Sequence, residues 1–243
     1  MYKIITDYLT PNKYSRPQIE LKEIKKLVIH WVGNSNTTAK QNRQFFENRK
    51  NGKTGYGSSQ EIIDLSGDVW VIIPDNEISY GCANNDYYYN ESGLAEELGK
   101  YPNDSIYSIE CTHTTDEGFM SLDTYLTLID RVSDLCIEYN LNPIEDVIRH
   151  FDITGKNCHK YFVIYEDKFI EFKQQVKDFV NIKLNNKKED NDKDNWKNNL
   201  AVKSINNLAK KGFLNNPEEH IENLKNETIE PYVFWAMIDR LSE

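Results

Sequence analysis

The sequence has no run of about 20 consecutive apolar residues, which is the length that a membrane-spanning helix needs. Its first ten residues, MYKIITDYLT, also lack the basic segment followed by roughly 7–15 apolar residues that marks a secretory signal peptide. We therefore expect no membrane span, and we expect synthesis in the cytoplasm without a signal peptide.

Basic charge is also scarce. The chain carries 29 Lys and Arg residues against 39 Asp and Glu residues, which gives a formal net charge of -10. A protein that binds nucleic acid gains affinity by neutralising phosphates with a basic face. The sequence shows no such face, so we expect no nucleic-acid partner.

Cysteine is sparse as well, with 4 residues at positions 82, 111, 136 and 158 of a 243-residue chain. The number is even, but the positions are scattered and the chain is long, so a disulfide framework is not indicated. Cys136 lies on the apolar stripe of a predicted helix, and we expect it to be part of the core.

The chain does have enough apolar side chains for a folded core, because 39% of its residues are hydrophobic and 12% are aromatic. A continuous apolar run at 26–32 suits a central strand covered on both faces, and 105–112 is a second strand candidate. Two β-rich runs within 61–74 flank SerGlyAsp and predict a hairpin. Apolar residues at helical spacing predict helices at 38–48, 122–139 and 165–179.

Three other segments show no regular period. Residues 8–17 contain two prolines and are predicted to form an extended arm. Residues 51–57 are rich in glycine and predict a turn-rich loop over a site. Residues 77–101 are rich in Asn and Tyr and are interpreted as a long surface loop, either a groove wall whose tyrosines stack on a ligand or an insertion without a role.

The composition divides the chain into three parts. Residues 1–180 hold the predicted strands and helices and form the main domain. Residues 181–199 are charged with both signs and have no apolar period, which predicts a linker. Residues 200–243 predict short helices, which form a small all-α segment.

The stretch from Ile148 to Phe162 carries the strongest chemical signal, because it places His150, Lys156 and Cys158 within nine residues. An imidazole and a thiolate suit a borderline-soft divalent metal such as zinc, and a catalytic zinc uses three protein ligands. ThrGly at 154–155 lets the chain turn back so that the two ligands meet. The best candidate for the remote third ligand is His30, at the end of the apolar run LeuValIle.

These residues carry a resemblance to a known family. His30 on an early strand, Glu110 in SerIleGluCys on a later strand, and HisPheAspIleThrGlyLysAsnCys resemble the zinc-dependent N-acetylmuramoyl-L-alanine amidases of the type-2 family. That family includes phage and prophage endolysins of Gram-positive hosts and the peptidoglycan recognition proteins. The resemblance covers about residues 1–175 and implies an α/β fold with a central mixed β-sheet flanked by helices.

The resemblance also implies a mechanism on bacterial cell-wall peptidoglycan. Zn²⁺ held by His30, His150 and Cys158 would activate water, and the amide between N-acetylmuramic acid and L-alanine would be cut. Glu110 would act as the general base, and Lys156 would place a positive charge near the oxyanion. The residues expected to contact substrate are Trp31, Asn34 and Tyr56.

Each assignment has an alternative. Glu110 would otherwise be a surface carboxylate on an edge strand, Lys156 a solvated loop lysine, and Cys158 a small buried hydrophobic residue. His159 follows Cys158 directly and would either compete as a ligand or lie on the surface. The two remaining histidines, His113 and His220, are expected at the surface.

Two departures from the family pattern concern the groove. Where many relatives have an aromatic residue followed by His, this chain has SerSerGlnGlu at 58–61, and where they have TrpHis it has TyrGly at 80–81. The metal-binding residues survive both departures. The lining of the peptide groove is therefore expected to differ from that of relatives.

Two alternative functions stay open beside a phage or prophage endolysin that acts on the wall after release from the cytoplasm. One is a non-catalytic peptidoglycan-binding protein, against which the presence of Cys158, Glu110 and Lys156 argues. The other is a cytosolic amidase that recycles muropeptides. The helical segment at 200–243 resembles the short tails of some prophage amidases and would serve wall binding, dimerisation or simple stabilisation. A homodimer formed through these C-terminal helices is a further expectation.

Overall fold

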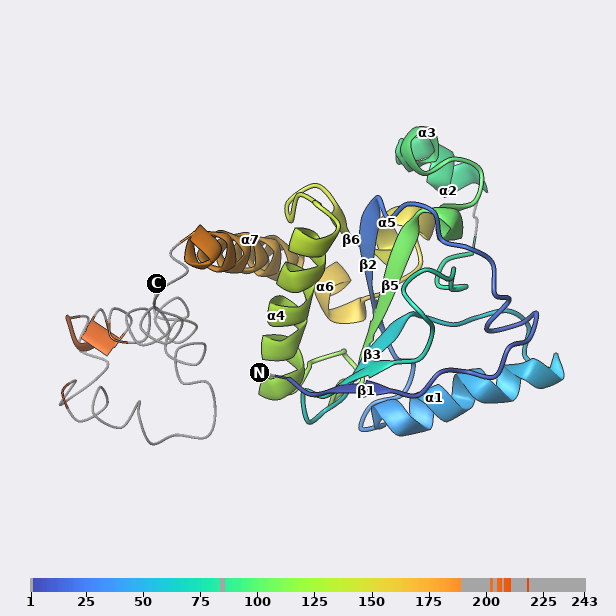
Figure 1. Ribbon diagram of the computed structural model, residues 1–243, viewed down its shortest axis with the longest axis horizontal. Helices are drawn as coiled ribbons and strands as arrows, with labels where there is room; N and C mark the ends of the chain where they lie inside the picture. Colours follow the sequence, from blue (N-terminus) through green and yellow to red (C-terminus); the bar gives the residue numbers. More distant parts are fainter. Residues whose placement is uncertain are drawn as a thin grey trace. The chain divides into compact units, whose positions relative to one another are not determined.

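The structure is a computed structural model that describes residues 2–83, 86–188, 202, 205, 206, 208–210 and 218. The chain divides into two compact units, one of residues Tyr2–Val180 and one of Asn181–Glu243 with Met1. The first unit holds the sheet and is shown in Figure 1. None of the helices in the described part of the chain is long and apolar enough to cross a membrane.

The first unit is built on a six-stranded sheet in the order β1-β4-β3-β5-β2-β6. Only β3 and β4 pair in antiparallel fashion, as the predicted hairpin requires, and every other pair is parallel. The strands are β1 (Ile4–Thr6), β2 (Lys26–Trp31), β3 (Glu61–Ile63), β4 (Val69–Val71), β5 (Ile106–Cys111) and β6 (Val147–Arg149).

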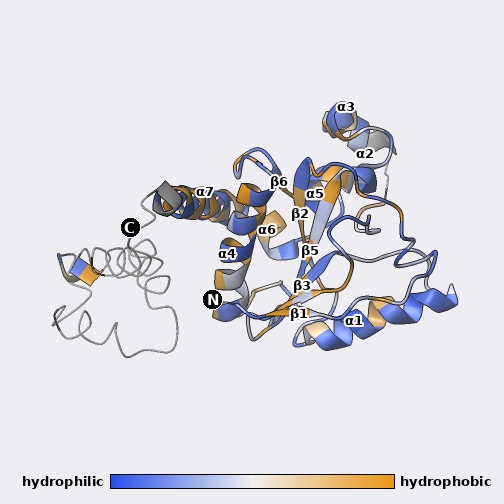
Figure 2. Ribbon diagram, in the orientation of Figure 1, coloured by the Kyte–Doolittle hydropathy of each residue, from blue (hydrophilic) through white to orange (hydrophobic). Residues whose placement is uncertain are grey.

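Helices cover both faces of this sheet. In Figure 1, α4 lies on one side with α7, and α1, α2 and α3 lie on the other. Figure 2 shows hydrophobic and hydrophilic residues alternating around α4, as expected for a helix with one buried face. The described helices are α1 (Ala39–Asn48), α2 (Asp86–Glu91), α3 (Leu94–Leu98), α4 (Leu122–Glu138), α5 (His150–Thr154), α6 (Lys160–Ile164) and α7 (Glu166–Lys188), with single 3-10 turns at Arg49–Asn51 and Pro102–Asp104.

Two of the three predicted helices begin at side-chain caps. The Thr38 hydroxyl accepts a hydrogen bond from the Gln41 amide, and the Thr38 amide donates to Gln41 Oε1, which starts α1. Ser121 accepts from the Thr124 amide and starts α4. Cys136 on α4 is buried, as expected.

Alternation along the strands gives the sheet two different faces. On one, Glu61 of β3 is held by the Arg131 guanidinium of α4 and accepts a hydrogen bond from the Tyr107 hydroxyl at 2.8 Å. On the other, Val28 of β2 packs with Tyr89 of α2 and other apolar residues. Side chains at even positions of β2 and β5 therefore face α2, and those at odd positions face α4.

The segment at 77–101 is a correction to the sequence prediction, because it contains α2 and α3 rather than one long loop. Tyr89 and Leu98 are buried, so this segment contributes to the core. Each helix spans six residues or fewer, which is less than two turns, and so short a segment has no detectable helical period.

The predicted linker also differs in part, since α7 continues to Lys188 beyond the expected start of the linker at residue 181. Extending an existing helix costs much less than nucleating one, so α7 continues over polar residues. Residues 189–199 and His220 lie outside the described residues, as does most of 200–243. Within the last range, Ile205 and Leu208 are helical and buried.

The N-terminal arm is tied to α1 by a buried carboxylate. The Thr10 amide donates to Glu47 Oε2 at 3.0 Å, and Lys50 Nζ lies 2.7 Å from Glu47 Oε1. Burial opposes the negative charge, but the hydrogen bonds from Lys50 and Thr10 and the Arg43 cation outweigh it and lower the pKa of Glu47 to about 2. Ionised Glu47 therefore stabilises the contact between the arm and the helix.

We predict that Glu47→Gln lowers the free energy of unfolding by about 1–2 kcal/mol at pH 7, after allowance for solvent screening. Because the pKa is depressed in the folded state, this loss is complete above the ordinary value of 4.5 and disappears as the pH falls toward 2. Urea denaturation at several pH values measures it. Glu171→Gln, in the more exposed pair with Lys168, is the matched control, and an equal loss in both variants at pH 7 would contradict the prediction.

Candidate metal centre

Two adjacent parallel strands bring the first candidate residues together. In the register of β2 with β5, His30 lies opposite Glu110, near the carboxyl end of both strands. Side chains opposite each other in a parallel pair point to the same face, here the face that carries α2 and α5. His30 is buried with 2% of its surface exposed.

The second histidine comes from the other neighbour of β2. Strand β6 pairs with β2 so that Arg149 lies opposite Ile29, and His150 is the next residue and the first of α5. The Arg149 amide donates to Asp152 Oδ2 at 2.7 Å, which starts the helix at this point. The rings of His30 and His150 therefore meet edge to face, with their centroids 4.8 Å apart.

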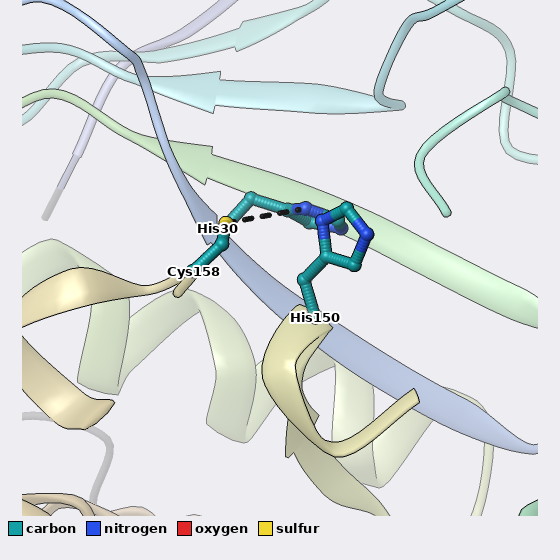
Figure 3. Close-up of side chains that lie close together, drawn as sticks. All are labelled: His30, His150 and Cys158. Carbon is teal, nitrogen blue, oxygen red and sulfur yellow. Dashed lines mark hydrogen bonds between the residues drawn. The ribbon is translucent and has the colours of Figure 1, made fainter. Parts of the chain in front are cut away.

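The cysteine returns to the same place through a tight turn. Gly155 ends α5 with a φ of 71°, a conformation that favours glycine, and the Phe151 amide donates to the Cys158 carbonyl at 2.7 Å. Cys158 Sγ then lies 3.8 Å from His30 Nδ1. The ligand atoms of His30, His150 and Cys158 all lie within 4.8 Å of one another. Figure 3 shows the three side chains gathered at one place.

The chemistry of these three donors fits a divalent metal ion. Burial and the neighbouring His150 lower the pKa of His30 well below its ordinary range, and burial followed by the Lys156 cation lowers the pKa of His150 to about 4. Both imidazoles are thus uncharged near neutral pH, with lone pairs available. Burial and the Glu110 charge raise the pKa of the Cys158 thiol to about 12, so a thiolate here requires an added cation.

Glu110 lies beside the cluster with an unusual environment for a carboxyl group. Its Oε2 atom is buried and has no hydrogen-bond partner among the residues that the structure describes. Burial raises the pKa of Glu110 to about 8, against the lowering effect of the Lys156 and Arg49 cations. Lys156 itself is exposed.

Arg49 is a residue near the site that the sequence analysis missed. Its guanidinium donates from Nη1 to the carbonyl groups of Thr54, Gly55 and Tyr56 at 2.7–3.2 Å and so holds the loop at 51–57. Its charge also acts on Glu110. No sequence pattern marks it, because it stands at the end of a polar helix among other charged residues.

The three residues expected to contact substrate lie in different surroundings. Tyr56 is 60% exposed, and its ring lies 5.3 Å from that of Tyr80 and 5.3 Å from that of Tyr14. Asn34 is exposed on the loop after β2. Trp31 instead alternates to the other face from His30, where it packs on His113 with ring centroids 4.6 Å apart.

The two other histidines that the structure describes, His113 and His159, do not join the cluster. His159 is buried against Phe162, with ring centroids 4.9 Å apart, and burial lowers its pKa to about 3. It is not part of the group that could hold a metal. The expectation that His113 lies at the surface is wrong, because His113 is fully buried with its ring nitrogens 2.6 Å from the carbonyl oxygens of Thr115 and Val32.

Known proteins share this sequence pattern. A profile of the N-acetylmuramoyl-L-alanine amidase family matches residues 20–160. The chain is 35% identical over 175 residues to the N-acetylmuramoyl-L-alanine amidase BlyA of Bacillus subtilis (strain 168). This aligned region covers 70% of this chain and 46% of BlyA. The chain is 25% identical over 176 residues to the N-acetylmuramoyl-L-alanine amidase CwlL of Bacillus licheniformis, covering 72% and 47%.

The chain therefore belongs to the N-acetylmuramoyl-L-alanine amidase family, as the sequence resemblance indicated. It spans about half the length of the curated relatives that it matches.

Solved structures show the same fold. The catalytic domain of PlyG superposes with a TM-score of 0.56 at 20% identity, over 73% of this chain and 95% of that one. A mutant endolysin from Bacillus subtilis gives a TM-score of 0.55 at 19% identity, over 72% and 99%. The predicted fold class, a mixed sheet flanked by helices, is confirmed.

Proposed function

We propose that this chain is a zinc-dependent peptidoglycan hydrolase that cuts the amide between the lactyl group of N-acetylmuramic acid and L-alanine. The observation that carries the proposal is the buried group of His30, His150 and Cys158, whose ligand atoms lie within 4.8 Å of one another beside Glu110. Members of the family generally depend on zinc. Three protein donors leave a fourth zinc position open for water or substrate, which is the pattern of catalytic sites.

The protein residues divide the work of the reaction. His30, His150 and Cys158 would hold the zinc, which when bound supplies a Lewis acid for water and for the scissile carbonyl. Burial raises the pKa of Glu110 to about 8, and the charge of a bound zinc ion would lower that pKa and favour the carboxylate. In this ionised form Glu110 takes a proton from the attacking water and returns it to the leaving amine of L-alanine, for which its unpartnered Oε2 is available. Lys156 supplies positive charge where the carbonyl oxygen becomes negative.

A row of partly exposed tyrosines supports a polymeric substrate. The ring of exposed Tyr56 lies 5.3 Å from those of half-buried Tyr14 and Tyr80, and Tyr56 belongs to the loop that Arg49 holds. Aromatic rings of this kind offer flat apolar faces to a sugar or a peptide while keeping their hydroxyl groups in water. We assign these tyrosines, and Asn34 on the loop after β2, to contact with the wall polymer rather than with the cut bond.

We predict that the purified chain binds one Zn²⁺ and that Cys158→Ala abolishes this binding, because two histidines alone leave the ion too few donors. Metal analysis after dialysis against a weak chelator measures the stoichiometry. Cys136→Ala is the matched control, since Cys136 is also a buried free cysteine but lies on α4. Zinc retained in the Cys158 variant, or absent from the unaltered chain, would contradict the metal assignment.

We predict that Glu110→Gln keeps the zinc and lowers the rate of amide cleavage at least ~100-fold, the usual contribution of a general base. The measurement is the release of L-alanine amino groups from purified walls, with zinc content determined on the same sample. Glu171→Gln on α7 serves as the control and should keep full activity. A fully active, zinc-loaded Glu110→Gln protein would remove Glu110 from the mechanism.

The nature of the substrate is tested by giving the full chain two substrates in parallel. Intact sacculi and a soluble muropeptide carry the same amide, so mass analysis of the new ends reports cleavage of either. We expect the polymer to be cut faster, and we expect Tyr56→Ala to lose more activity on sacculi than on the muropeptide. Preference for the soluble fragment would favour a recycling amidase, and binding of sacculi without new ends would favour a non-catalytic recognition protein.

A further inference from the structure

The buried hydroxyl group of Ser108 lies close to the His30 ring and has no part in the mechanism above. Ser108 is fully buried on β5, two residues before Glu110 and on the same face of the strand. Its hydroxyl has no hydrogen-bond partner among the described residues, and neither has Nε2 of His30. A buried hydroxyl and a buried imidazole nitrogen that both lack partners are costly, and they require an explanation.

Gly81 shows that these two atoms border the same small space. A Cβ atom added to Gly81 would lie 2.1 Å from Ser108 Oγ and 3.3 Å from His30 Nε2. The first distance is far too short for any side chain larger than glycine. The absence of a side chain at position 81 therefore leaves room for the Ser108 hydroxyl beside the His30 ring.

The orientation of the His30 ring determines which of its nitrogens faces the metal cluster and which faces the space beside Gly81. Its Nδ1 atom is the one that faces Cys158 Sγ, at 3.8 Å, so Nδ1 is the nitrogen available to a metal ion. A neutral imidazole whose Nδ1 carries the lone pair holds its proton on Nε2. Histidines that bind metals generally donate this second proton to a nearby acceptor, which sets both the tautomer and the ring orientation.

We propose that Ser108 is the positioning residue for His30: its hydroxyl accepts the Nε2 proton through one water molecule beside Gly81, and so keeps Nδ1 free for the metal. Gly81 is the residue that makes this arrangement possible. The inference rests on the proposed zinc site, but it concerns residues that neither bind the metal nor touch the substrate.

The test is the zinc affinity of the full-length chain, measured by competition with a chromophoric chelator. Ser108→Ala should weaken zinc binding about 10–100-fold, the usual effect of removing such an outer partner. Urea denaturation of the metal-free chain should show no loss of stability, because the Ser108 hydroxyl makes no direct hydrogen bond to another described residue. A purely structural serine would give the opposite pair of results, with lower stability and unchanged affinity for zinc.

A double variant separates the hydrogen bond from packing. Gly81→Ala should disturb the site by crowding Ser108, and Gly81→Ala combined with Ser108→Gly should restore the room and the fold but not the zinc affinity. Full recovery of affinity in the double variant, or a Ser108→Ala chain that binds zinc as tightly as the unaltered chain, would overturn the inference. If the unaltered chain binds no zinc, the proposed function fails first, so the two failures are distinguishable.

Discussion

The register of β2 between its two parallel neighbours is the constraint on which the site depends. Pairing with β5 sets His30 beside Glu110, and pairing with β6 brings His150 to the same edge of the sheet. Side chains alternate along a strand, so a slip of β2 by one residue would turn His30 toward α4. His30 would then lie on the opposite face of the sheet from Glu110 and His150. The chain thus needs few loop residues to build the cluster, because the backbone ladder supplies most of its geometry.

The two faces of the sheet differ in whether their buried ionisable side chains have hydrogen-bond partners. Toward α4, Glu61 has both Arg131 and Tyr107 as partners, so its burial is compensated by hydrogen bonds. Toward α2, Glu110 and His30 each keep a buried atom without a partner among the described residues. Unpaired buried polar atoms lower stability, and such violations of good packing are expected where a protein binds something. This contrast separates a structural ion pair from a site.

The sequence predicted those elements whose pattern extends over many residues, and those site residues that lie close together along the chain. The apolar run of β2 and the period of α4 extend over enough residues to be recognised, and the spacing of His150 and Cys158 around Gly155 predicts their return to one place. Strands β1 and β6 escaped prediction because each spans three residues and has no flanking turn signal such as the SerGlyAsp between β3 and β4. Their existence depends on partners supplied by the rest of the sheet, which is information that no local window contains.

Polar residues inside buried strands are the hardest to interpret from sequence. On a strand covered on both faces, apolar residues occur at odd and even positions alike. The sequence then shows no hydrophobic alternation that would indicate to which face a polar side chain points. Trp31 and Ser108 illustrate the two outcomes. Trp31 follows His30 directly and therefore packs on the opposite face, whereas Ser108 precedes Glu110 by two residues and therefore shares its face. When one catalytic or metal-binding residue has been assigned on such a strand, the residues two positions before and after it are the next candidates. The period of two places their side chains on the same face, beside the same site.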